Sequence, residues 1–99
     1  MILGKIIGTV WSTRKDENLV GAKFLIVRQL NLDYTPKDST VIAVDSVGAG
    51  VGEIVLVAQG SSARQTGFTK NKPVDAVIMA IVDKLDVSVK DKLKELVEA

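Results

Sequence analysis

One run of the chain, residues 45–53, carries the strongest candidates for a binding or catalytic site and reads DSVGAGVGE. Three glycines, Gly48, Gly50 and Gly52, alternate between two strongly apolar segments, and a carboxylate stands at each end of the run. Because glycine has no Cβ and tolerates positive φ, such a loop can bring its backbone very close to another group. The candidates for that group are a phosphate and another protein chain.

The spacing of the glycines differs from that of phosphate-binding loops. A dinucleotide-binding loop reads G-x-G-x-x-G and opens a helix, whose N-terminal amides hold the pyrophosphate. Here the spacing is G-x-G-x-G, a strand-like segment follows Glu53, and no Gly-Lys-Ser/Thr occurs. We therefore interpret residues 45–53 as a tight strand connection with close backbone packing.

Catalytic and metal chemistry find little support in the other residues. The chain has no histidine and no cysteine, which removes the commonest general base, thiolate chemistry and disulfides. A nucleophilic Ser61 or Ser62 would need a lysine base, and neither serine begins a Ser-x-x-Lys motif. The remaining carboxylates lie at predicted strand ends with no calcium-loop spacing, and they are Asp45, Glu53, Asp75 and Asp83. We expect no catalytic residue, no cofactor and no metal.

Five short apolar runs rich in Val and Ile are the elements that position these residues. They cover residues 2–11, 23–30, 41–44, 53–58 and 74–82. Their lengths and bounding turn residues predict strands of a small all-β barrel or sandwich, with residues 31–40 as a polar connector. The 99 residues predict one domain, with the barrel over residues 1–85.

Two segments read as helical. Ser61 and Ser62 offer an N-cap hydroxyl, and Gly67 is placed to end a short helix after the fourth strand. A second helix is predicted over residues 88–99, with Ser88 as its N-cap. Its apolar face is formed by Val89, Leu93, Leu96 and Val97.

Composition weakens a nucleic-acid or membrane role. The formal net charge is +1, with 13 basic and 12 acidic residues, so no strong field attracts polyanions. A single-strand binder needs stacking aromatics in a basic groove, and this chain has only Trp11, Phe24, Tyr34 and Phe68. We interpret Trp11 and Phe24 as core or interface anchors. The first residues lack the order of a signal peptide and no run reaches membrane-spanning length, so we expect a cytoplasmic protein.

Several of the predicted strands are apolar on both faces. Residues 24–27, 54–57 and 76–82 lack the alternation of apolar and polar residues that a half-exposed antiparallel strand shows. A small barrel has one interior, so the second face needs another cover. A large exposed apolar surface usually marks an interface. The sequence therefore predicts self-association.

Three stretches together resemble a known family. They read GKIIGTVWSTRKDENLVGAKFLIVRQL, VIAVDSVGAGVGEIVLVAQGSSAR and VDAVIMAIVD. In this order they are similar to the EutN/CcmL family, the pentameric vertex proteins of bacterial microcompartments, over residues 1–85. The pairing of DSVGAGVGE with GSSAR is the most specific part of the likeness, and the segment after Val87 is the least diagnostic.

The resemblance implies a five-stranded barrel similar to the oligonucleotide-binding fold, assembled into a cyclic homopentamer. Such pentamers occupy the corners of a polyhedral shell whose facets are hexameric proteins of another family, and the vertex proteins are not known for catalysis. Carboxysomes and the shells for ethanolamine, propanediol or glycyl-radical metabolism all use similar vertex proteins. The other hypotheses are an oligonucleotide- or small-ligand-binding module and an enzyme at the subunit interfaces.

By this resemblance the site residues are subunit-contact or pore residues. We expect the loop carrying Gly48, Gly50 and Gly52, and the segment 61–64, to lie at or near subunit contacts. If Gly52 permits close backbone approach, Gly52→Val should weaken the pentamer. Arg64 is a candidate for an intersubunit ion pair with Glu53 or Asp45 of a neighbour, and a solvated helix arginine is the alternative.

Overall fold

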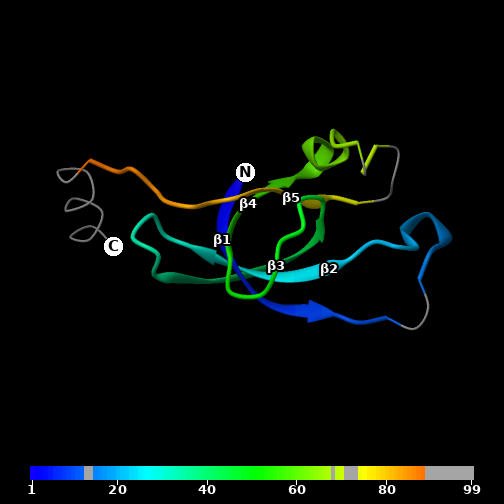
Figure 1. Ribbon diagram of the computed structural model, residues 1–99, viewed down its shortest axis with the longest axis horizontal. Coiled ribbons are helices and arrows are strands. Elements are labelled where there is room, and N and C mark those ends of the chain that lie inside the picture. The colour runs from blue at the N-terminus through cyan, green and yellow to red at the C-terminus, as the bar shows by residue number, and fades with distance from the viewer. Residues whose placement is uncertain (13–14, 68, 71–73, 89–99) are drawn as a thin grey trace.

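Five β-strands close into a barrel in the computed structural model, which describes residues 1–12, 15–67, 69–70 and 74–88 (Figure 1). The strands are β1 (Ile2–Val10), β2 (Phe24–Leu30), β3 (Pro36–Asp45), β4 (Ile54–Gln59) and β5 (Ala76–Ile81), and two 3-10 helices are η1 (Glu17–Leu19) and η2 (Gly60–Arg64). Around the barrel the order is β1-β2-β3-β5-β4. The predicted five-stranded barrel with a short helix after the fourth strand is confirmed. The predicted C-terminal helix lies outside the described residues from Val89 onward.

The barrel interior is filled by one side chain in two from each strand, as the pleat requires. Its largest fully buried members include Ile6, Leu25, Val27, Val55, Val57 and Ile78. Their neighbours Ile26 in β2 and Leu56 in β4 are only partly buried on the outer face. Ala58 of β4 is an exception, because it is buried in a small cluster with Ala63 and Val77. The apolar inner faces of the strands are thus buried within one protomer, whereas their apolar outer faces are only partly buried.

The third strand is longer than its apolar run predicts. Residues 36–40, predicted as connector, form the first half of β3, and Pro36 stands opposite Leu30 at the start of the strand. Proline is tolerated at a strand's first residue because no ladder hydrogen bond is then lost. These residues are exposed in a hairpin that extends beyond the barrel (Figure 1), so no apolar alternation marks them.

The segment after β5 runs back along this hairpin. The backbone N–H of Leu85 donates to the Tyr34 hydroxyl at 3.1 Å. Tyr34 itself has a positive φ of 70° in the turn between β2 and β3. This contact ties the end of the described chain to the tip of the hairpin.

A close approach that requires glycine occurs at Gly4 of β1. A Cβ added there would lie 2.3 Å from Val27 Cγ1 and 2.9 Å from the backbone oxygen of Arg28. Separations this short cannot be relieved by a side-chain rotation alone, because one of the neighbours is backbone. Gly4 therefore allows β1 and β2 to pack closely at this point.

Candidate assembly surface

The two carboxylates at the ends of the glycine loop (residues 45–53) hold the loop's own backbone. Asp45 Oδ1 accepts three backbone N–H groups at 3.1 Å each. Their donors are Val47, Gly48 and Ala49. At the other end, Glu53 Oε1 accepts the N–H of Gly50 at 2.7 Å. Both acids are therefore structural acceptors for loop amides, a role that their position at predicted strand ends did not indicate.

The glycine loop is fastened to one end of the barrel. Gly52 donates its N–H to the Ile6 carbonyl at 2.8 Å, and Ile6 donates to the Glu53 carbonyl at 3.0 Å. Lys23 Nζ donates to the carbonyl of Ala49 at 3.0 Å. Ala49 is 1% exposed and packs in the barrel core. The loop thus closes the barrel end and turns its remaining residues outward.

Glycine is required in this loop by backbone conformation and not by contact within the protomer. Gly48 and Gly52 have φ of +79° and +93°, and a Cβ added at either would meet nothing within 4 Å. Only Gly50 has an ordinary φ, with Glu53 Oε1 at 3.6 Å from its added Cβ. The close approach expected at Gly52 is therefore absent inside one chain. A Gly52→Val variant would strain the backbone whatever its effect on assembly.

The second predicted contact segment is η2. This helix begins at Gly60, whose φ is +66°, and ends at Arg64, three residues before the predicted terminator Gly67. Arg64 is exposed, and its Nη1 donates to the Val74 carbonyl at 3.4 Å. The side chains of Ser61 and Ser62 lie outside the described residues. Within the protomer, Arg64 therefore bonds the backbone ahead of β5 and not Asp45 or Glu53.

Exposed apolar side chains surround the barrel on its outer surface. Trp11 is 89% exposed, so its interpretation as a core residue is wrong and only the interface interpretation stays open. Phe24 is half-buried, with Lys15 Nζ 5.2 Å from its ring centroid. Val51 in the glycine loop is 64% exposed. The apolar content of the sequence signalled such a surface but not which side chains would form it.

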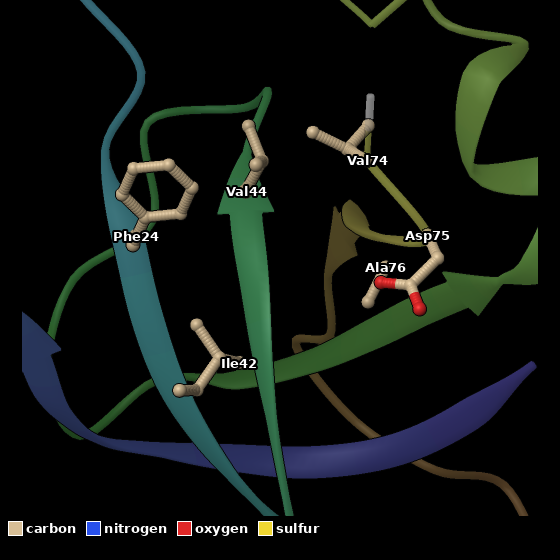
Figure 2. Close-up of a pocket in the computed structure, with 6 residues that line it drawn as sticks. All are labelled: Phe24, Ile42, Val44, Val74, Asp75 and Ala76. Carbon is tan, nitrogen blue, oxygen red and sulfur yellow. The ribbon is translucent and has the colours of Figure 1, made fainter. Parts of the chain in front are cut away.

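A shallow hollow lies beside the second half of β3. Its volume is about 250 Å³, and it is lined by Phe24, Ile42, Val44, Val74, Asp75 and Ala76. Figure 2 shows Phe24, Ile42 and Val44 on one side and the segment leading into β5 on the other. Ile42 is 55% exposed at its edge. Sequence reasoning missed this hollow because it arises where β3 and the residues before β5 diverge.

The part of the chain that the structure describes contains neither a candidate metal site nor a membrane-spanning helix. The described residues bring together no group of three or more acidic side chains able to hold a metal ion. They also contain no helix that is long and apolar enough to cross a membrane. The surface described above is therefore the feature that the geometry offers for function.

Comparison with known proteins finds matches along most of the chain. A family model described as ethanolamine utilisation protein EutN/carboxysome matches residues 1–83. The bacterial microcompartment shell vertex protein GrpN of Rhodospirillum rubrum (strain F11) is 50% identical over 86 residues, which are 87% of this chain and 97% of GrpN.

Solved structures agree with these sequence matches. The pentameric microcompartment shell protein GrpN from Rhodospirillum rubrum superposes with a TM-score of 0.81 at 49% identity, covering 89% of this chain and 100% of that chain. Gloeobacter violaceus CcmL superposes with a TM-score of 0.84 at 40% identity, covering 89% and 91% of the two chains. The matched region includes the barrel and the glycine loop.

Proposed function

The chain belongs to the EutN/CcmL family, and we propose that it is a structural shell protein whose cyclic pentamers cap the vertices of a polyhedral bacterial microcompartment. The observation that carries this function is the near full-length likeness to a pentameric shell protein at 49% identity. Relatives are named as shell vertex proteins of bacterial microcompartments, as GrpN and PduN are, and of carboxysomes, as CcmL is. The function is thus common to the family, whichever shell this chain serves.

The shape of a closed shell explains why a pentamer is needed. A flat sheet of hexagonal units cannot close by itself, and fivefold units at the corners supply the curvature. The partners of this chain are then four further copies of itself and hexameric facet proteins. The pentamer lies within a shell in the bacterial cytoplasm and binds neither nucleic acid nor membrane, in keeping with its net charge of +1.

The chain acts without catalysis. Its two conspicuous carboxylates, Asp45 and Glu53, are occupied by loop amides, so neither is positioned as an acid or base for a substrate. The alternative of an oligonucleotide-binding module rests on the barrel alone, and a barrel fold does not by itself specify a function.

The glycine loop and η2 provide subunit contacts in this assembly. The loop presents the exposed Val51 together with Gly48 and Gly52, beside which the protomer leaves open space. A cyclic ring uses heterologous contacts, so each protomer needs two different surfaces that complement each other. We assign the loop and the segment around Arg64 to parts of these surfaces.

Co-expression with a hexameric shell protein tests this function. We expect closed polyhedral particles in electron micrographs when the chain is present, with the chain at the corners. Without it, the same hexamers should give open sheets or tubes, because no fivefold unit is available. Closed particles that form equally well without the chain, or a chain found only inside them, would contradict the function.

A further inference from the structure

Two strand edges of this closed barrel have no strand beside them. β3 begins at Pro36 but pairs with β5 only through Val44 and Asp45. β1 pairs with β4 only up to Lys5, and the glycine loop extends that pairing only to Ile6. Among the described residues, the edge of β3 before Val44 and the edge of β1 after Ile6 are therefore open.

The backbone groups on these edges point outward. Asp45 donates its N–H to the Lys23 carbonyl at 2.9 Å, so Asp45 faces β2. Because facing alternates along an antiparallel pair, the N–H and C=O groups of Thr40 and Ile42 face away from β2. The same alternation in β2 directs the backbone N–H and C=O groups of Phe24 and Ile26 toward Val10 and Gly8 of β1. The backbone groups of Thr9, between these two, therefore face away from β2.

The open edge of β3 is only half protected against pairing. Natural proteins blunt exposed edges with proline and charged side chains. Pro36, Lys37 and Asp38 do this at the hairpin end of β3, but residues 39–42 carry neither charge nor proline. The unprotected half ends at Ile42, which borders the apolar hollow in Figure 2. An edge of this kind, next to an apolar recess, suits an added strand that carries an apolar side chain.

An exposed apolar side chain, that of Trp11, follows the open edge of β1. Trp11 follows the last residue of β1 and is 89% exposed in the protomer. Because the two edges belong to different strands, pairing them between protomers gives a heterologous contact, which is the type that closes a ring.

We propose that the open edge of β3 pairs with the open edge of β1 of the next protomer, and that this neighbour's Trp11 fills the hollow at Ile42. The sheet then continues across each subunit contact. This contact rests on the proposed pentamer and specifies which surfaces hold it together.

Thr40→Pro tests the pairing, with Thr40→Ala as its matched control. Proline removes an N–H that faces the open edge, so the ladder with β2 is kept, and Ser39 before it is already in an extended strand. We expect Thr40→Pro to raise the protein concentration for half-assembly by about tenfold or more. Thr40→Ala should assemble like wild type. Circular dichroism checks that both variants fold, and Thr40→Pro pentamers at wild-type concentrations would overturn the pairing.

Amide hydrogen exchange of the unmodified protein gives a second, independent readout. In the assembled protein the amides of Thr9, Thr40 and Ile42 should exchange as slowly as amides between β1 and β2. The emission of Trp11, the single tryptophan, should shift to shorter wavelength on assembly. Fast exchange at these amides, or solvent-like emission, in an intact pentamer would overturn the contact but leave the proposed function standing. A wild-type chain that forms no pentamer would contradict both.

Discussion

Replacing Asp45 with alanine is expected to lower the free energy of unfolding by about 3 kcal/mol and to weaken the assembly. The carboxylate accepts three backbone N–H groups at 3.1 Å each, and alanine leaves all three without that acceptor. Hydrogen bonds to a charged acceptor contribute more than neutral ones. Because the freed amides belong to the glycine loop, the loop should lose its fixed shape. Chemical denaturation at one fixed protein concentration measures the change.

Asp45→Asn is the matched control for this prediction. Asparagine keeps one oxygen acceptor at the same position but has no charge, so we expect it to retain more than half of the lost stability. An Asp45→Ala variant as stable as wild type would show that the hydrogen bonds of Asp45 contribute nothing to the loop. If Asp45→Ala and Asp45→Asn lower the free energy of unfolding equally, the stabilisation by Asp45 comes from its charge alone.

Substitution of Gly50 is expected to disrupt the pentamer in proportion to the size of the side chain. Gly50 has an ordinary φ, and its added Cβ meets only Glu53 Oε1 at an ordinary 3.6 Å. The protomer should therefore accept Gly50→Ala with little strain, and the Gly50→Leu backbone avoids the positive φ that strains Gly52→Val. Circular dichroism checks that the Gly50→Leu protein folds. If a neighbouring subunit packs against the loop, the pentamer should weaken slightly in Gly50→Ala and by about tenfold or more in Gly50→Leu. Native mass spectrometry over a dilution series measures the loss.

Gly67→Leu is the control for that series. Gly67 also has an ordinary φ and open surroundings, but it lies outside both the glycine loop and η2. We expect its pentamer to persist at wild-type concentrations. A Gly50→Leu protein that assembles as well as Gly67→Leu would remove the glycine loop from the subunit contact.

Much of the barrel could be predicted from the sequence because buried strands leave a strong apolar signal. Each predicted strand overlaps an observed one, and the ends differ by at most two residues in all cases except β3. The first half of β3 carried no such signal, since it stands in a hairpin outside the core with no interior to fill. The order of strands around the barrel was likewise hidden, because apolar periodicity reports burial and not which strands are neighbours.

The position of the candidate site in the sequence could be predicted, but the roles of its residues could not. Alternating glycines with flanking acids marked the loop, yet only the folded backbone shows Asp45 and Glu53 turned inward onto its amides. The glycine with the closest approach inside the protomer is Gly4, and nothing in the sequence around Gly4 indicates that approach. The exposure of Trp11 was equally hidden, because an aromatic residue after a strand reads the same whether it faces the core or a neighbour.

The mass of the assembled wild-type protein shows directly whether the chain forms a pentamer. Native mass spectrometry of the purified chain, at concentrations well above those of the dilution series, should give one dominant species of five chain masses with no bound nucleic acid. A monomer, a dimer or a hexamer as the dominant species would contradict the account.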